Sequence, residues 1–172
     1  MRSDTLWDKL CGSEILNRNP PAAPLDLHGL EAKLGATLPP SYRSFLEWSD
    51  GASFEAFTLL PCTEVDRFEV RHRKWIDAFL GSHFEVVADL AKEAPDRYGA
   101  EQDPACFPVV QLRQTIQISK SFEDGRVLLL NPTRRGPDGE WEAWDFSNFH
   151  PGAFLYPSFR ELLSVLVQSG IE

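Results

Sequence analysis

The chain has 172 residues, 42% hydrophobic and 25% charged, so its composition is that of a globular domain and excludes an extended disordered chain. Seventeen lysines and arginines stand against 26 aspartates and glutamates, which gives a formal net charge of −9. Such a chain lacks the basic stripe that holds nucleic-acid phosphates, so we expect no nucleic-acid partner. The acidic charge can attract a basic protein, although solubility alone also explains it.

Cysteine and histidine usage indicates neither a metal site nor a disulfide framework. The three cysteines and four histidines are scattered, and no Cys-x-x-Cys pair occurs. We therefore expect no metal, no cofactor and a reducing compartment. The N-terminus carries Asp4, Asp8 and Lys9 instead of the apolar segment of a signal peptide, and no run reaches the roughly 18 apolar residues of a membrane span. These features predict a cytoplasmic protein without a membrane anchor.

The N-terminal residues are predicted to lie outside the main domain. Residues 1–18 can form a short helix, and the run NPPAAP over 19–24 interrupts it, because prolines lack a backbone donor and restrict their neighbours. We expect residues 1–24 to be an N-terminal extension and residues 25–172 to be one domain.

Two short helices are predicted next. Asp26 can cap the first, whose leucines recur at helical spacing before Gly35, a residue suited to a left-handed C-cap. Pro40 suits the first turn of the second helix, because its missing N–H would have no partner there. Asp50-Gly51 ends the second helix, whose stripe at helical spacing is Tyr42, Phe45, Leu46 and Ser49.

The middle of the chain is less regular. Residues 54–60 alternate weakly, which is typical of a strand, and residues 63–80 carry a one-sided apolar pattern, which is typical of a helix. Residues 86–94 fit either structure. A loop over 95–108 leads into a strand expected over 107–112 (FPVVQL).

The C-terminal part predicts a meander of strands and a final helix. TIQIS (115–119) is expected to pair with RVLLLN (126–131) across the turn sequence FEDG, and EWEAWDF (140–146) is a third strand. The S-x-x-E capping box at 158–161 opens a helix that Gly170 closes. This order of elements predicts an α+β fold with a mainly antiparallel sheet flanked by helices.

No catalytic constellation emerges from the sequence. Glu140 and Glu142 lie on one face of one strand, so they cannot face each other across a substrate as glycosidase carboxylates do. His150 lies close to Asp145, but no nucleophile motif accompanies this acid–base pair. Neither a Walker loop nor a dinucleotide-binding loop occurs. We therefore expect a binding protein and not an enzyme.

The tryptophans of the third strand suggest a contact surface. Trp141 and Trp144 point to opposite faces, so one is exposed or is covered by another element such as the N-terminal extension. An exposed Trp144 among acids would suit a basic partner, whereas a solvated strand face is the plain alternative. We expect Glu142→Lys to weaken such binding at an unchanged melting temperature. The candidate contact residues are Glu47, Asp50, Glu55, Glu140, Glu142, Trp144 and Asp145.

The stretch LEAKLGATLPPSYRSFLEWSDG (30–51) resembles the entry motif of the SUKH superfamily, which includes the fungal cell-wall-synthesis regulator domain. The tail LYPSFRELL and the strands RVLLLNP and GEWEAWDF are also similar to that family, so the resemblance covers about residues 25–168. The segment around 63–105 departs from it as a longer, more basic insert. The matching residues of the entry motif are Glu31, Leu34, Gly35, Leu38, Pro39, Tyr42, Phe45, Leu46 and Gly51.

The resemblance implies a SUKH-like fold and a role in binding. Bacterial members of the superfamily are typically immunity proteins that bind and block a toxin domain, often a nuclease, of a polymorphic toxin system. We therefore expect a cognate toxin domain as the partner, bound by protein–protein contact. The alternative is a regulatory scaffold of the cell-wall-synthesis regulator type that binds a cellular partner.

Overall fold

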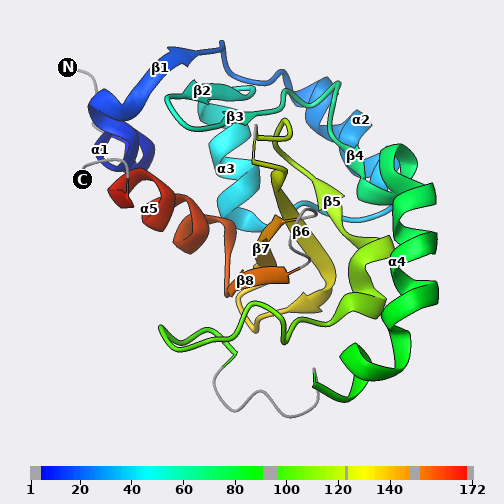
Figure 1. Ribbon diagram of the computed structural model, residues 1–172. Coiled ribbons are helices and arrows are strands. Elements are labelled where there is room, and N and C mark those ends of the chain that lie inside the picture. The colour runs from blue at the N-terminus through cyan, green and yellow to red at the C-terminus, as the bar shows by residue number, and fades with distance from the viewer. Residues whose placement is uncertain (1–4, 91–96, 123, 148–151, 170–172) are drawn as a thin grey trace.

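A computed structural model gives the fold, and it describes residues 5–90, 97–122, 124–147 and 152–169 (Figure 1). Helices and strands alternate irregularly along the chain. In order, the elements are α1 (Leu6–Cys11), η1 (Gly12–Glu14), β1 (Ile15–Arg18), α2 (Pro24–Leu34), α3 (Pro40–Trp48), β2 (Ala52–Phe54), β3 (Thr58–Leu59), β4 (Asp66–Arg67), α4 (Phe68–Leu90), η2 (Val109–Gln114), β5 (Ile116–Gln117), β6 (Arg126–Arg135), β7 (Trp141–Ser147), β8 (Gly152–Tyr156) and α5 (Phe159–Ser169).

The described strands form two antiparallel sheets that meet at one edge. The larger sheet has five strands in the order β4-β5-β6-β7-β8, and the smaller has three in the order β1-β2-β3. A bridge between Leu59 and Ser119 joins them, and Leu60 N donates to Ile118 O beside it at 2.9 Å. The α+β fold with antiparallel sheets is therefore confirmed, as is the pairing of 115–119 with 126–131.

Both faces of the five-stranded sheet are buried, and they form two separate cores. Trp141 packs into a core with α3, α5 and Trp7 of α1. Trp144 points the other way, into a core with residues of α4 and η2 such as Phe68 and Leu112. Figure 1 shows α4 on one side of the sheet and α3 and α5 on the other. The alternation of the two tryptophans is confirmed, but the second core comes from the 63–105 insert and η2, not from the N-terminal extension.

Capping residues explain where the helices begin and end. Gly35 ends α2 in the left-handed conformation with φ 68°, as predicted. The N-cap of α2 is Ala23 and not Asp26, which lies in the first turn because Pro24 already occupies the first helical position. At α5, Ser158 Oγ accepts a hydrogen bond from Glu161 N at 3.2 Å, as the capping box predicts. The predicted terminator Gly170 lies outside the described residues.

Two predictions for the middle of the chain are wrong. The strand expected over 54–60 is a hairpin of β2 and β3, because Phe54 N donates to Phe57 O across a tight turn. The strand expected over 107–112 is mostly the 3₁₀ helix η2. Its buried Val109 and Leu112 stand three residues apart, which is the repeat of a 3₁₀ helix and not of a strand.

Helix α4 differs from the predicted helix in both of its bounds. It begins at Phe68 instead of residue 63, because β4 precedes it and pairs with β5. It continues to Leu90, so the described part of the ambiguous segment 86–94 is helical. Residue His72 breaks the regular helical geometry, and its ring stacks on Phe68 with 4.4 Å between centroids.

The N-terminal residues pack onto the domain. Strand β1 pairs with β2, although the sequence predicted no strand there. Trp7 contacts Phe45 and Phe159, with ring centroids 5.5 and 5.9 Å apart. Its Nε1 donates to Ser44 Oγ at 3.1 Å. The domain boundary at residue 24 remains a prediction, and Trp7 offers a way to test it.

Candidate partner-binding groove

An open groove of about 980 Å³ lies at one end of the five-stranded sheet. The ends of β6, β7 and β8 form its floor. This floor lies on the same face of the five-stranded sheet that α3 and α5 cover elsewhere. The turn of the β2–β3 hairpin, helix α5 and a loop at 103–105 bound it. We refer to this feature as the groove.

An ion pair lies on the floor of the groove. Arg126 of β6 donates from Nε and Nη2 to the two carboxylate oxygens of Asp145 on β7, at 3.1 and 2.6 Å. The hydrogen bond to Asp145 outweighs burial and raises the pKa of Arg126. Both carboxylate oxygens of Asp145 therefore accept a hydrogen bond from Arg126, and the charges of the two residues offset each other.

Aromatic side chains form the walls of the groove. Phe57 stacks on Phe54 and Phe122, with ring centroids 4.4 and 6.0 Å apart, and the guanidinium of Arg126 lies 5.0 Å from the Phe122 ring centre. On the side of β8, Phe154 is 43% exposed, and Tyr156 is half-buried. Exposed aromatic groups in a concave site are typical of binding sites.

The sheet edge beside the groove is already paired. Pro104 O accepts from Ala153 N at 2.8 Å, and the amide of Gln102 bonds both N and O of Leu155 on β8. A partner strand therefore cannot extend the sheet at β8 without displacing this loop. Contacts in the groove have to come from side chains of the partner.

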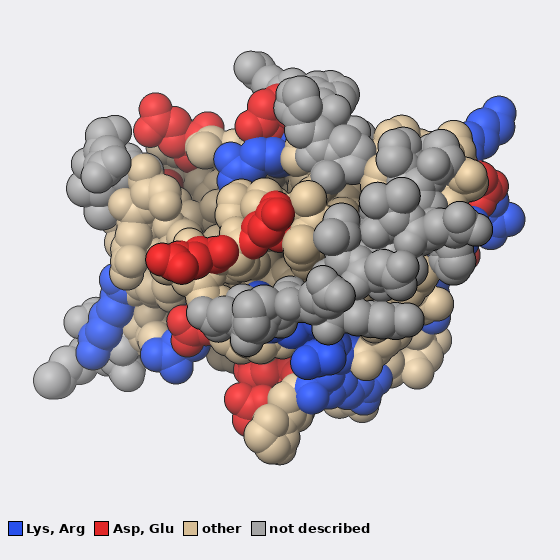
Figure 2. All heavy atoms as spheres, turned by 60° about the horizontal axis from the view of Figure 1, so that its bottom comes forward, with Lys and Arg blue, Asp and Glu red and all other residues tan. Residues whose placement is uncertain are grey.

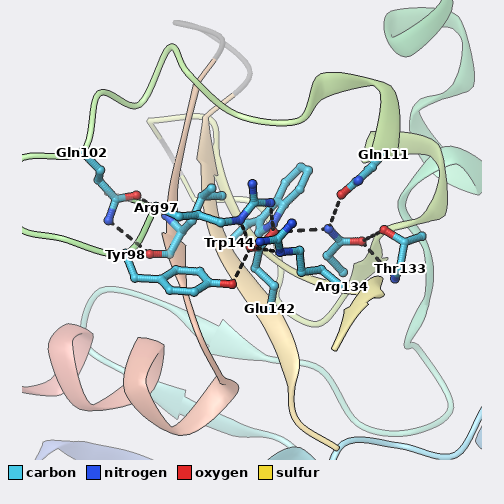
Figure 3. Close-up of polar contacts among 10 residues, drawn as sticks. Arg97, Tyr98, Gln102, Gln111, Thr133, Arg134, Glu142 and Trp144 are labelled. Atoms are coloured by element: carbon cyan, nitrogen blue, oxygen red, sulfur yellow. Dashed lines mark hydrogen bonds and ion pairs between the residues drawn. The ribbon is translucent and has the colours of Figure 1, made fainter. Parts of the chain in front are cut away.

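A buried carboxylate holds the same loop from the opposite face of β7. Glu142 accepts from Arg97 Nε and Nη2 at 2.5 and 2.9 Å, from Tyr98 Oη at 2.9 Å and from Trp144 Nε1 at 2.8 Å (Figure 3). Its side chain is 0% exposed. Burial raises its pKa, but the hydrogen bonds from Arg97 and Trp144 outweigh burial, so the pKa of Glu142 is lowered.

This burial corrects the predicted contact patch. Trp144 and Glu142 are both buried, so the prediction that they form a surface patch is wrong. The physical reason is that α4 and η2 cover this face of the sheet. Glu142→Lys would then place an ammonium against Arg97 inside the second core, and we expect it to destabilise the fold.

Glu140 has a structural role. Its carboxylate accepts from Ser41 N and Ser41 Oγ, both at 2.8 Å, and so caps the start of α3. Asp50 is also engaged, because its Oδ1 accepts from Cys62 N at 2.7 Å. Glu47 is exposed on α3 and pairs with Arg43. None of these three residues lines the groove.

Two of the seven predicted contact residues lie in or beside the groove. Asp145 is on its floor, and Glu55 is exposed on the hairpin turn next to Ala56, which lines it. The sequence reasoning missed Asp103 and Phe154. The apolar residues of β8 were a usable signal, because Phe154 and Leu155 must point to opposite faces of a strand and cannot both enter one core.

Charges of both signs are interspersed on the face that Figure 2 shows, so the surplus acidic charge is not gathered there into one broad patch. Among the described residues, no group of His, Cys, Asp and Glu has an arrangement that could hold a metal ion. None of the helices in the described ranges is long and apolar enough to cross a membrane. His150, the other half of the acid–base pair considered from the sequence, lies outside the described residues.

A comparison with protein families identifies the chain. The sequence model of the SMI1 / KNR4 family (SUKH-1) matches residues 21–165. The chain belongs to this family. The SUKH resemblance of the 30–51 stretch is thus confirmed, and membership of SUKH-1 favours an immunity or regulatory role exerted by binding. A comparison with curated proteins found no match.

Proposed function

We propose that this SUKH-1 protein is an immunity protein, which neutralises a cognate toxin domain by protein–protein contact through the groove. The groove carries the proposal, because it combines exposed aromatic groups, a satisfied ion pair and acidic side chains on its rim. Such a site can bury a side chain of another protein.

The charge of the chain supports a toxin that acts on nucleic acid. A nuclease domain has to hold phosphates and tends to be basic. A partner with a net charge of −9 is attracted to such a surface and associates faster with it. An acidic protein bound there competes with the substrate for the same surface.

Co-expression tests the proposal. The candidate partner is a toxin domain encoded by a gene that neighbours this one, and it is expressed with the wild-type chain, with Phe154→Lys or with Val70→Lys. Phe154 lies in the groove, whereas Val70 is an exposed residue of α4 outside it. We expect survival and co-purification with the wild type and with Val70→Lys, and loss of both with Phe154→Lys, which removes an aromatic wall and places a cation in the groove.

The outcomes separate the candidate roles. Cell death in the presence of the folded wild-type chain would contradict the immunity role. If the same chain then co-purified a protein of its own cell, the regulatory scaffold would be the better description. Circular dichroism of each variant confirms that loss of protection does not come from unfolding.

A further inference from the structure

We infer that the groove binds a basic segment of the partner, whose lysine or arginine side chains pair with Glu55 on one side of the groove and with Asp103 on the other. The inference rests on the proposed function, since it specifies the chemistry of the segment that enters the groove. It follows from the charge balance of the site, from the positions of its walls and from the paired edge of β8.

The charge balance of the groove leaves uncompensated carboxylates. Arg126 is offset by Asp145 on the floor, and Asp124 adds a further acid 3.9 Å from Arg126. Glu55 and Asp103 are exposed, and neither has a cationic partner among the described residues. The groove and its rim therefore carry net negative charge, which a cation from outside can satisfy.

The walls place these two carboxylates on opposite sides. Glu55 is on the β2–β3 hairpin, which adjoins the strand at 115–119 through the Leu59–Ser119 bridge. Asp103 is on the loop that pairs with β8, at the far edge of the larger sheet. Strands β6 and β7 lie between the two sides, so a basic segment that lies across the groove meets an acid on each flank.

The apolar surfaces between the carboxylates suit the stem of a long cationic side chain. Phe154 and Tyr156 on β8 and Val165 on α5 line the groove, and Phe154 and Val165 are exposed to 43% and 41%. Lysine and arginine lay their methylene groups on such surfaces while the charged end stays near water and acid. A cation above an aromatic face gains a further electrostatic attraction.

The paired edge of β8 argues against main-chain recognition. Gln102 and Pro104 occupy the hydrogen-bonding groups of Leu155 and Ala153 that a partner strand would need. An acidic partner segment would meet Glu55 and Asp103 without a free cation in the described groove. A basic side chain is therefore the occupant that the site fits.

Charge reversal tests the inference, with the candidate toxin domain of the co-expression test as the probe. The variants are Glu55→Lys and Asp103→Lys, and the matched control is Glu64→Lys, which makes the same change of net charge at an exposed residue outside the groove. Binding is measured by titration calorimetry at low and at physiological salt. We expect each groove variant to weaken the affinity about tenfold and the control to weaken it less than about threefold.

A further arm identifies the partner residue. Carbodiimide joins carboxylates to lysine amines without a spacer, so mass spectrometry of the treated complex shows which lysine lies against Glu55 or Asp103. We expect the reverse change of that lysine to glutamate to restore binding to the matching lysine variant. If the bound residue is arginine, no such cross-link forms, and replacement of each toxin arginine by glutamate identifies it through the same rescue.

Each outcome bears on a separate claim. If the toxin domain binds the wild type and all three lysine variants lose the same affinity, the groove inference is overturned, while the immunity function stands. If the wild type does not bind the toxin domain, both are overturned. Thermal melts of all variants show whether a loss of affinity reflects unfolding instead, and Glu55→Gln and Asp103→Asn then replace the lysine variants in the same titrations.

Discussion

Arg97 places Nε and Nη2 on the two carboxylate oxygens of Glu142, although the two residues lie 45 positions apart in the chain. Glu142 belongs to β7, whereas Arg97 belongs to the loop whose later residues pair with β8 and form one wall of the groove. The pair therefore links the second core to the shape of the groove. Because neither oxygen of Glu142 is exposed, the guanidinium replaces the water that the carboxylate would otherwise bind.

Replacing Arg97 tests this link. Arg97→Met removes the main cationic partner of a fully buried carboxylate, so we expect the free energy of unfolding to fall by about 3–5 kcal/mol. The control is Arg134→Met, because Arg134 is 53% exposed and lies 4.0 Å from the same carboxylate. We expect its effect to stay within about 0.5 kcal/mol in urea denaturation. Equal losses in both variants would show that the Arg97 contact has no special role.

The same pair predicts a dependence of stability on pH. The pKa of Glu142 is lowered from its usual value of 4.5, so its ionised form stabilises the fold above that pH. This stabilisation is lost as the pH falls through the lower pKa of the folded state. In Arg97→Met the guanidinium no longer lowers the pKa of Glu142, so we expect that pKa to be higher than in the wild type. We therefore expect the difference in melting temperature between wild type and Arg97→Met to become smaller as the pH falls from neutral to about pH 3. A constant difference would contradict this assignment.

Glu140 predicts a smaller, local effect. Helix α3 has Pro39 as its N-cap, which offers no side-chain acceptor, and Glu140 supplies one from a distant part of the chain. Glu140→Ala should cost about 1 kcal/mol of stability, the usual value of a lost N-cap. Glu47→Ala removes an exposed carboxylate from the same helix, so it should change stability by less than about 0.5 kcal/mol. Urea denaturation compares the two, and a larger loss at Glu47 would refute the capping role.

Local patterns predicted much of this fold. Gly35, the Pro40 start of α3 and the capping box at 158–161 are predicted from short stretches of sequence, because each satisfies a backbone requirement within a few positions. The pairing of 115–119 with 126–131 also followed from a short turn. The family motif at 30–51 is also a local pattern, because one continuous stretch of sequence encodes two helices and their connection.

The site was less predictable, because its residues depend on distant contacts. Glu142 looks like a solvated strand acid in sequence, but distant segments bury it, namely α4, η2 and the loop that carries Arg97. The groove likewise brings together Phe57, Asp103 and Phe154 from three separate segments. No periodicity within one segment shows that α5 leaves this end of the sheet uncovered.

Trp7 tests whether the N-terminal residues belong to the folding unit. The family match starts at residue 21, yet Trp7 is 2% exposed and lies against Phe45 and Phe159. Trp7→Ala should therefore destabilise the protein by about 3–5 kcal/mol, as expected for Phe45→Ala in the same cluster. Leu6→Ala is the matched control, because Leu6 is the preceding residue and is exposed. If Trp7→Ala lost no more stability than Leu6→Ala in urea denaturation, the N-terminal extension would be dispensable for the core. A loss confined to Trp7→Ala would instead place the start of the folding unit before residue 24, because the Trp7 ring packs between Phe45 of α3 and Phe159 of α5 in this core.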